Sequence, residues 1–506
     1  MAAPQEESSA DSVALRKIYG RSCVPEVSEP VAAVLQGQLP AWLQGKLLRN
    51  GPGMASVGVD RYNHALDSLA LIRQFSIENG QVFYQNRFLR SQSFLRNQKA
   101  NRIVVSEFGT MAHHDPCSSV FERLSSYFSM DMSDNALVNV MPIGDDVYAM
   151  TETPHLFRVD LDTLETLERK SLKNLVAVHI ATAHPHLDPG DGATYNIGTK
   201  MGARPAFILV RYPPGVEGGA SSVDHVTAVG KIPLQSRVAA PYIHSFGLTE
   251  NLAVVLEQSL HIPSMLKAKF FRHKTYIDAL KFYSKKNVRY HVMKKNTEDL
   301  HPGVIESTAF FTFHHINAFE RGDELVVDLI CYDDESIIRD FDLTGKNPVS
   351  GKSGYLRRFV LPLYLAPNER VSVKPQCLAK NELCGELPRI NQNLNGKAYQ
   401  FVYCLSNVKG EEHRPCISKL DVSTGDWLRW ERKGWFPSEP VFVPRSGAVD
   451  EDDGVVLSSL LREDDDKKLA LVVIDARTFQ QLAVAEFDCP SSMQADFHGW
   501  FLQQEV

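Results

Sequence analysis

The sequence lacks several features that define large classes of proteins. Its 506 residues contain no uninterrupted run of about 18 apolar residues, so no membrane-spanning helix is predicted. The eight cysteines include no Cys-x-x-Cys pair, which argues against a zinc ribbon and against a disulfide framework. Positive charge is not in excess, because the net charge is −7, so the composition gives no indication of nucleic-acid binding. With 43% hydrophobic residues, the chain has ample material for a folded core.

A targeting signal is also lacking at the beginning of the sequence. Met1–Asp11 has neither the basic start nor the apolar centre of a signal peptide. Its acidic residues are unlike the Arg-rich composition of mitochondrial presequences. We therefore expect residues 1–30 to form a disordered tail, residues 31–506 to form a single domain, and the protein to be cytoplasmic.

Short apolar stretches separated by turns indicate a β-rich fold. Several of them alternate between apolar and polar residues in the manner of half-buried strands: Leu69–Ile77, Gln81–Tyr84, Arg102–Glu107 and Val147–Thr151. Turn-forming residues separate these stretches, which predicts a succession of short strands rather than long helices.

One pattern recurs along the chain as a strand, an Asp-centred turn and a second strand. It is present in Phe157–Leu167, Ile417–Leu428 and Val472–Leu482. In each copy the Asp side chain can bond the turn backbone. Asp421 and Asp475 are 54 residues apart, and hairpins that recur with such a period favour a propeller of four-stranded blades.

Two segments depart from this β pattern. In the first, five residues fall on one helical stripe: Leu266, Phe270, His273, Ile277 and Leu280. Between Lys267 and Lys295 there are ten Lys or Arg residues and one acid. A basic, aromatic helix predicts contact with an anionic membrane surface, and an ordinary solvated helix is the alternative. The second segment, Pro116–Phe128, also has helical apolar spacing.

Four histidines lie in segments rich in small, apolar and aromatic residues: His184, His244, His314 and His498. His314 is the best placed, because strand-like stretches lie on both sides of it, in Ile305–Phe313 and Glu324–Cys331. A histidine at a strand end is a good metal ligand, since packing fixes its imidazole before the ion arrives. A single such histidine is more often a core residue. Spacings of 60, 70 and 184 residues, however, fit a ring of blades that each present one side chain to the axis.

The motifs around these residues resemble the carotenoid cleavage oxygenases, and most closely the animal carotene oxygenases. They run from Pro40–Pro52 through Val105–Met111, Glu386–Asn391 and Ser438–Pro444 to Phe497–Gly499, which is nearly the whole chain. The resemblance implies an all-β fold, a seven-bladed β-propeller with a helical and loop cap over the face that carries iron.

The resemblance also implies a set of site residues. Four neutral imidazoles leave two positions of an octahedral ion open, which suits Fe(II) and dioxygen better than zinc. The implied iron ligands are His184, His244, His314 and His498. The carboxylates that match the family's partners of the outer imidazole nitrogens are Glu152, Glu386 and Glu439. We interpret the neighbouring His186 and His315 as structural.

The implied enzyme is a non-haem Fe(II) dioxygenase that cleaves a polyene double bond into two carbonyl products. Central cleavage of β-carotene to retinal is the first choice and eccentric cleavage at the 9′,10′ bond the second. Aromatic side chains can stabilise positive charge on the polyene by cation–π contact, and plain core packing is the alternative for each candidate. These candidates for the substrate tunnel are Tyr242, Phe311, Phe313 and Tyr332. Because carotenoids reside in bilayers, we also expect peripheral attachment to membranes.

One segment departs from the family pattern. Where relatives read Asn-His-Trp-Phe-Asp-Gly, this chain has Asn63-His-Ala-Leu-Asp-Ser68. Ser68 is strained if glycine is needed there for an unusual backbone angle, and the smaller Ala65 and Leu66 leave space. The departure makes substrate choice uncertain and keeps an inactive carotenoid-binding protein as an alternative. A retinyl-ester isomerohydrolase, which uses the same fold and iron ligands, is a further alternative.

Overall fold

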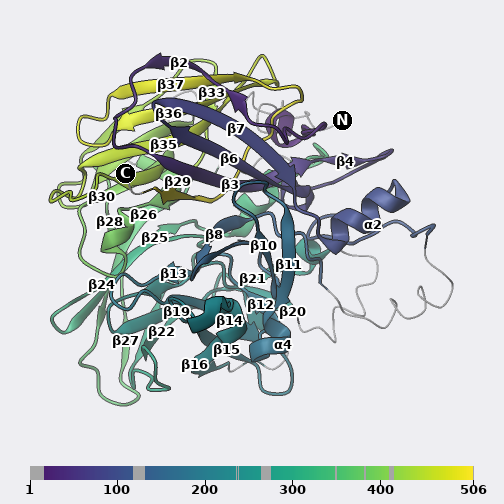
Figure 1. The fold of residues 1–506 in the computed structure, drawn as a ribbon. Helices are drawn as coiled ribbons and strands as arrows, with labels where there is room; N and C mark the ends of the chain where they lie inside the picture. The colour runs from purple at the N-terminus through teal and green to yellow at the C-terminus, as the bar shows by residue number, and fades with distance from the viewer. Residues whose placement is uncertain are drawn as a thin grey trace, which may run out of the picture.

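The sheets of the described part of the chain form seven blades around a central axis, and Figure 1 shows how their strands are arranged. This computed structural model describes residues 16–117, 132–234, 236, 239–263, 275–347, 350, 352–380, 383–408 and 415–504. Neighbouring strands within each blade are antiparallel, apart from the parallel pair β23–β27. The predicted all-β class and the seven-bladed propeller are confirmed.

The first four blades follow one another in sequence, apart from β38 of blade 1 and β27 of blade 4, which come from later in the chain. Blade 1 contains β1 (Val31–Ala32), β7 (Gln81–Phe88), β6 (Leu69–Glu78), β3 (Gly45–Met54) and β38 (Gly499–Gln503). Blade 2 contains β8 (Asn139–Ile143), β9 (Asp146–Met150), β10 (His155–Val159) and β11 (Thr166–Ser171). Blade 3 contains β12 (Ile180–Ala181), β13 (His186–Leu187), β14 (Thr194–Lys200), β15 (Ala206–Tyr212) and β16 (Thr227–Pro233). Blade 4 contains β18 (Gly247–Leu248), β19 (Leu252–Glu257), β22 (Val288–Lys294), β23 (Val304–Ser307) and β27 (Arg370–Ser372).

The remaining three blades complete the ring, and blades 5 and 6 are joined into one eight-stranded sheet by the pairing of β26 with β29 at Tyr355 and Cys384. Blade 5 contains β24 (His315–Arg321), β25 (Glu324–Cys331), β26 (Tyr355–Pro362) and β28 (Gln376–Cys377). Blade 6 contains β29 (Leu383–Arg389), β30 (Phe401–Val408), β31 (Cys416–Asp421) and β32 (Trp427–Trp430). Blade 7 contains β2 (Val34–Gly37), β33 (Trp435–Pro437), β34 (Val441–Pro444), β35 (Gly454–Arg462), β36 (Lys468–Asp475) and β37 (Gln481–Asp488).

Strands from distant parts of the sequence close the ring. In blade 1, β38 pairs with β3, so that Gly499 lies opposite Arg49. In blade 7, β2 pairs with β37. Each pairing joins a strand from the beginning of the described chain to one from its end. Backbone hydrogen bonds therefore close the ring.

The hydrophobic core lies between neighbouring blades. One cluster joins Val255 of blade 4 to Ile197 of blade 3, and another joins Leu256 of blade 4 to Val327 of blade 5. Buried strands such as β36 are apolar on both faces because each face packs against a different blade. This packing fixes the inner strands, whose ends carry the candidate metal ligands.

Short segments between the blades cover the side of the ring that carries the histidines. They include the small sheet of β17 (Ala239–Pro241), β20 (Leu260–Pro263) and β21 (Lys281–Phe282), with α6 (Tyr276–Ala279) and η5 (Glu335–Phe341). Ile277, Phe282 and Ile338 of these segments pack in one cluster with Tyr242 and Phe311. Other short helices are α2 (Gln92–Ala100), α4 (Leu172–Val176), η1 (Ala65–Asp67), η2 (Glu217–Gly219), η3 (Ser222–His225) and η7 (Gln392–Leu394), and β4 (Ser56–Val57) pairs with β5 (Asp60–Arg61).

The recurring Asp-centred hairpins are confirmed. The pairs β10–β11, β31–β32 and β36–β37 are connected by turns in which Asp160, Asp421 and Asp475 accept hydrogen bonds from the backbone nitrogens two and three residues later. Four residues after each Asp the backbone is left-handed: φ is 57° at Leu164, 76° at Gly425 and 57° at Phe479. The two non-glycine residues there are buried, so packing offsets the cost of that conformation.

The expected strand Arg102–Glu107 is wrong, because this segment is a loop. Its backbone nitrogens donate to nearby carbonyls, as at Arg102 and Glu107, or to side chains, and not to a partner strand. The nitrogen of Ile103 donates to the carboxylate of Asp60 at 3.1 Å, and that of Val104 donates to the Asn97 side chain at 2.8 Å. Apolar alternation alone did not reveal these side-chain acceptors.

The prediction of a basic helix is wrong for most of the described part of that segment. Only residues 276–279 of its described part are helical, in α6, and the chain continues into strands β21 and β22. Thr275 and Asp278 form a capping box at the start of α6. Residues 264–274 and most of Pro116–Phe128 lie outside the described residues. No helix among the described residues is long and apolar enough to cross a membrane.

The expected tail ends earlier than residue 30. From residue 16 onwards the chain packs against the propeller: Ile18, Cys23 and Val27 are buried in the core between blades 1 and 7. The backbone nitrogen of Cys23 also donates to the carbonyl of Gly53 at 2.7 Å. Residues 1–15 lie outside the described residues.

Replacing Asp475 by Ala should lower the free energy of unfolding by about 1–2 kcal/mol, because the turn nitrogens lose their acceptor. Asp475→Asn is the matched control, since its amide oxygen can still accept these bonds. Thermal and denaturant unfolding of the three proteins measure the effect. Equal stability of Asp475→Ala and the wild type would show that the turn does not depend on this carboxylate.

Candidate metal centre

The four predicted histidines lie at the beginnings of inner strands. His184 lies in the gap between β12 and β13, His244 precedes β18, His314 precedes β24 and His498 precedes β38. Each comes from a different blade, so the propeller brings together residues that are far apart in the sequence.

The imidazoles converge on one point. One ring nitrogen from each histidine lies within 4.8 Å of those of the other three. The Nε2 atoms of His184 and His244 are 3.0 Å apart, and those of His244 and His314 are 3.2 Å apart. His244, His314 and His498 are buried, and His184 is partly buried. This is the only such group of metal-ligating residues among the described parts of the chain.

Three of these imidazoles are held from behind by carboxylates. The Nδ1 atom of His244 is 2.5 Å from Glu152, that of His314 is 2.5 Å from Glu386, and that of His498 is 2.7 Å from Glu439. Glu152, Glu386 and Glu439 are the same three carboxylates that were predicted to hold the outer nitrogens of the imidazoles. Within the described chain, His184 has no carboxylate partner.

The hydrogen positions follow from this arrangement. A carboxylate can only accept, so each Nδ1 carries the hydrogen and each Nε2 presents a lone pair. Lone pairs of His244 and His314 that face each other at 3.2 Å repel unless a cation lies between them. The donor set therefore fits a metal ion coordinated by neutral imidazoles.

Burial keeps three of the imidazoles neutral. It lowers the pKa of His184 well below 6.5, and the neighbouring histidines lower it further. Burial also lowers the pKa of His244, although Glu152 opposes the shift. For His498, burial outweighs the opposing effect of Glu439 and lowers the pKa to about 4. These three imidazoles are thus unprotonated at neutral pH, as metal ligation requires.

The three carboxylates have different surroundings. Glu152 accepts a hydrogen bond from the hydroxyl of Tyr242 at 2.7 Å, and Glu386 accepts one from Tyr332 at 2.7 Å. Burial raises the pKa of both tyrosines well above 10, and the adjacent carboxylates raise it further. Both hydroxyls therefore remain protonated and can donate.

Glu439 is surrounded by cations instead. Arg49 Nη1 lies 2.8 Å from its Oε2 atom, and Arg389 Nη1 lies 3.7 Å from its Oε1 atom. Burial alone raises the pKa of Glu439, but Arg389, His498 and Arg49 outweigh it and lower the pKa to about 2. Glu439 is thus ionised and buried.

The predicted tunnel aromatics lie beside the histidines. The ring of Phe313 contacts that of His244 at 4.8 Å between centroids, and Phe311 contacts both Phe313 at 4.7 Å and Tyr242 at 6.1 Å. Phe311 is fully buried and Tyr332 nearly so, whereas Phe313 and Tyr242 keep 9% and 7% of their surface accessible. Phe313 and Tyr242 are therefore the better placed of the four to touch a substrate.

The two neighbouring histidines bond to other protein groups. His186 has Asn395 Oδ1 at 2.9 Å from Nδ1 and the carbonyl of Phe246 at 2.8 Å from Nε2. His315 Nδ1 lies 2.8 Å from Ser245 Oγ. Neither is among the four converging histidines.

The altered segment Asn63–Ser68 is not strained at its last residue. Ser68 has φ −57° and ψ 143°, a conformation open to any residue, so glycine is not required there. Ala65 is fully buried, and Leu66 packs in the cluster that contains Phe497, the neighbour of His498. The smaller side chains at Ala65 and Leu66 have not opened these two positions to solvent.

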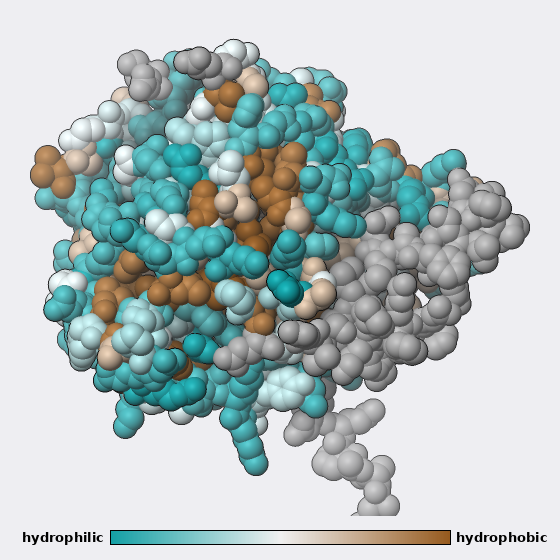
Figure 2. All heavy atoms as spheres, turned by 90° about the horizontal axis from the view of Figure 1, so that it is seen from below, coloured by the Kyte–Doolittle hydropathy of each residue, from teal (hydrophilic) through white to brown (hydrophobic). Residues whose placement is uncertain are grey.

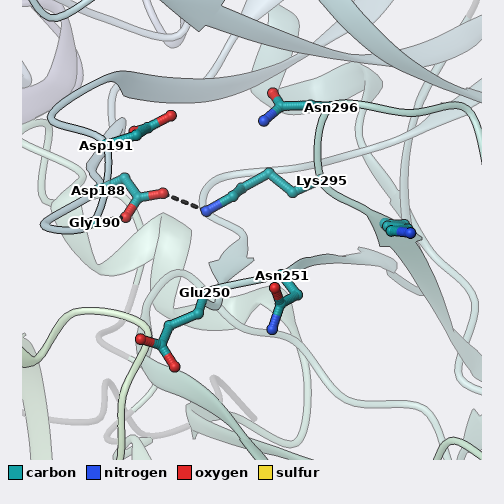
Figure 3. Close-up of a pocket in the computed structure, with 8 residues that line it drawn as sticks. Asp188, Gly190, Asp191, Glu250, Asn251, Lys295 and Asn296 are labelled. Carbon is teal, nitrogen blue, oxygen red and sulfur yellow. Dashed lines mark hydrogen bonds and ion pairs between the residues drawn. The ribbon is translucent and has the colours of Figure 1, made fainter.

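A separate pocket of about 380 Å³ contains none of the predicted site residues (Figure 3). Asp188 and Lys295 form an ion pair in it, and Asp191, Glu250, Asn251 and Asn296 also line it. Because Lys295 already neutralises Asp188, this pocket is a poor cation site.

Sequence reasoning missed Arg49, Arg389 and Asp496, which lie behind His498. The available signal was a charged residue within an apolar stretch, because Arg49 follows Leu47 and Leu48 in a buried strand. A buried arginine needs anionic partners.

Comparisons with known proteins agree with this geometry. Residues 20–503 match the family model described as retinal pigment epithelial membrane protein. Human beta,beta-carotene 15,15′-dioxygenase is 37% identical over 96% of this chain and 94% of its own length. The carotenoid isomerooxygenase of Galleria mellonella is 37% identical over 97% of both chains. The human mitochondrial carotenoid-cleaving dioxygenase is 34% identical over 95% of this chain and 89% of its own length.

A solved structure supports the fold. Cobalt-substituted apocarotenoid oxygenase of Synechocystis superposes with a TM-score of 0.81, covering 97% of this chain and 99% of that one at 24% identity.

Replacing Glu386 by Ala should weaken metal binding about 10-fold to 100-fold, because the His314 ring loses the acceptor that orients it. Glu386→Gln should lose less, since an amide oxygen can still accept. Metal titration of the protein stripped of metal measures both. Glu451→Ala is the control, because Glu451 is a partly buried acid that bonds the Gln400 and Phe401 nitrogens instead. Unchanged affinity in Glu386→Ala would contradict the orienting role.

Proposed function

Because the chain belongs to the family of the retinal pigment epithelial membrane protein and the carotenoid oxygenases, we propose that it is an Fe(II)-dependent dioxygenase that cleaves a carotenoid. The observation that carries the proposal is the convergence of four imidazoles, three of them held by carboxylates at their Nδ1 atoms. That donor set suits a divalent metal that must keep positions open for other ligands.

The proposed iron ligands are His184, His244, His314 and His498, and the carboxylates that orient them are Glu152, Glu386 and Glu439. When bound, iron supplies the binding and electron-transfer chemistry that dioxygen needs to react with a double bond. In the overall reaction one C=C bond is broken, and each carbon receives one oxygen atom of O₂ to give two carbonyl groups.

The residues around the centre position the substrate and exclude water. Phe313 and Tyr242 present aromatic surface beside the histidines, which suits stacking on a flat polyene. Their rings can also stabilise positive charge that develops on the polyene. Phe311 packs behind them, and Tyr332 holds Glu386 through its hydroxyl. The apolar cluster around these residues keeps the reacting bond away from solvent.

We propose β-carotene as the substrate and central cleavage to retinal as the reaction. The support is the identity to relatives named beta,beta-carotene 15,15′-dioxygenase, which is 37% for the human protein against 34% for the human carotenoid-cleaving dioxygenase. Eccentric cleavage at the 9′,10′ bond is therefore the second choice.

A second candidate is cleavage coupled to isomerisation of one product. The observation in its favour is the Galleria mellonella relative, which is named carotenoid isomerooxygenase and is as similar to this chain as the human 15,15′-dioxygenase. The two candidates share the iron centre and differ in the geometry of the retinal released.

We also propose that the protein is cytoplasmic and attaches peripherally to membranes, from which it draws its substrate. The support is local. Tyr276 and Tyr283 are exposed beside the exposed Lys281, while Ile277 and Phe282 of the same segment reach the aromatic cluster near the histidines. Aromatic and basic residues together suit the interface of an anionic bilayer.

Part of the basic segment is used within the protein. Lys286 pairs with Glu257, and Lys295 pairs with Asp188.

In addition, Figure 2 shows apolar side chains gathered in a hollow of the underside between hydrophilic ones. Exposed apolar surface of this kind is typical of lipid or protein contact sites.

The wild-type protein, loaded with Fe(II) and given β-carotene in air, should release retinal, whereas His314→Ala should lose both iron and activity. The reason is that the substitution removes one of the four imidazoles that are proposed to hold the iron. Product chromatography and iron analysis measure the two results. His315→Ala is the matched control and should retain iron, since His315 bonds to Ser245 instead.

Other products would change the assignment. An apo-10′-carotenal with an ionone would indicate eccentric cleavage, and 11-cis retinal would indicate coupled isomerisation. Bound, unaltered carotenoid would support a binding protein, and hydrolysis of retinyl esters an isomerohydrolase. Iron retained in an active His314→Ala protein would remove this residue from the ligand set.

Liposome flotation should recover the protein with anionic vesicles at low salt. The double variant Lys281→Glu/Lys285→Glu should float less, because two exposed cations become anions. Lys433→Glu/Lys467→Glu, at exposed positions in the blade 7 region, is the charge-matched control and should behave as the wild type. Equal flotation with anionic and neutral vesicles would argue against a role of the basic segment in membrane binding.

A further inference from the structure

Arg49 is a fully buried cation beside the point where the ring closes. It lies on β3 opposite Gly499 of β38, the residue after the ligand His498. Its guanidinium donates to Glu439 Oε2 at 2.8 Å and to Asp496 Oδ1 at 2.5 and 2.8 Å. Further donation reaches Ser438 Oγ at 3.2 Å and the Phe497 carbonyl at 2.8 Å. Its contacts thus join the Glu439 segment to the residues that directly precede His498.

This arrangement distinguishes Glu439 from the other two carboxylates. Glu152 and Glu386 meet neutral tyrosine hydroxyls, whereas Glu439 meets the guanidinium groups of Arg49 and Arg389. A carboxylate that shares its charge with a cation accepts less strongly from an imidazole N–H than a carboxylate without one.

The buried charges behind His498 are balanced. Arg49 and Arg389 supply two positive charges, and Glu439 and Asp496 supply two negative ones. Asp496 is in turn bonded by the hydroxyl of Ser459 at 2.6 Å. An unpaired charge at this depth is costly, so the four groups hold one another in place.

We propose that Arg49 is a positioning residue of the metal centre, which fixes His498 through Glu439 and Asp496 and makes this imidazole a weaker electron donor than His244 and His314. The inference rests on the proposed metal-binding role of the four histidines. Imidazole basicity rises with the charge on the acceptor behind it. The centre is therefore electronically unequal, with two strongly supported ligands and one whose carboxylate is neutralised.

The test uses the full-length protein stripped of metal and titrated with Co(II), whose absorption bands report the ligand field. Arg49→Lys keeps the charge but loses the fork that joins Glu439 to Asp496. It should bind Co(II) about 10-fold to 100-fold more weakly and shift the absorption bands.

Arg73→Lys is the matched control. Arg73 is equally buried and lies opposite Arg49 on the neighbouring strand, but its guanidinium donates to the backbone carbonyls of Leu71, Pro52 and Gln494 and contacts the Cys23 thiol rather than a carboxylate. Its replacement should lower thermal stability without changing the Co(II) spectrum. A merely structural role of Arg49 would make the two variants behave alike.

A double-mutant cycle separates action through Glu439 from general damage. In a Glu439→Gln background, Arg49→Lys should have a much smaller effect on Co(II) affinity, because the neutralised carboxylate is already gone. Equal effects in the two backgrounds would overturn the proposal. If Arg49→Lys does not fold, the charge-balanced variant Arg49→Gln/Asp496→Asn provides the same comparison.

The outcome also separates this inference from the proposed function. A wild-type protein that binds neither Co(II) nor Fe(II) would refute the metal centre itself. Normal binding by the wild type, with an unchanged affinity and spectrum in folded Arg49→Lys, would refute only the role of Arg49.

Discussion

The hydrogen bond between a carboxylate and an imidazole at the axis of the ring is the interaction on which the centre depends. It fixes the orientation of His244, His314 and His498 and leaves each Nε2 atom free to bind a metal. Because an ionised carboxylate is costly to bury, each of the three also needs its own partner. Tyrosine hydroxyls serve two of them and guanidinium groups serve the third, so the demands of the site extend through several layers of the protein.

The propeller is suited to meet these demands. Its inner strands approach the axis from different directions, and each is held by apolar packing on both faces of its blade. Imidazoles at the starts of such strands are therefore placed by the whole ring rather than by a loop. The aromatic cluster beside them adds a dry surface that suits a polyene.

Part of this architecture could be predicted from the sequence. The Asp-centred hairpins were recognisable because the turn chemistry is local, and the four histidines because their surrounding motifs resemble a known family. The loop at 102–107 was not predictable from alternation, since its backbone donates to the side chain of the distant Asp60 and to that of Asn97 at the preceding helix. Arg49 was missed for a similar reason: its partners are about 390 and 447 residues away along the chain, and only the closed ring brings them together.

The closure of the ring also determines when the centre can form during synthesis. Blade 1 begins with strands made early, but its β38 strand follows blade 7 in the sequence. His184, His244 and His314 emerge from the ribosome well before His498, and until β38 joins β3 the set of ligands is incomplete. A site with all four imidazoles can therefore form only late in synthesis, because an earlier nascent chain has at most three of them.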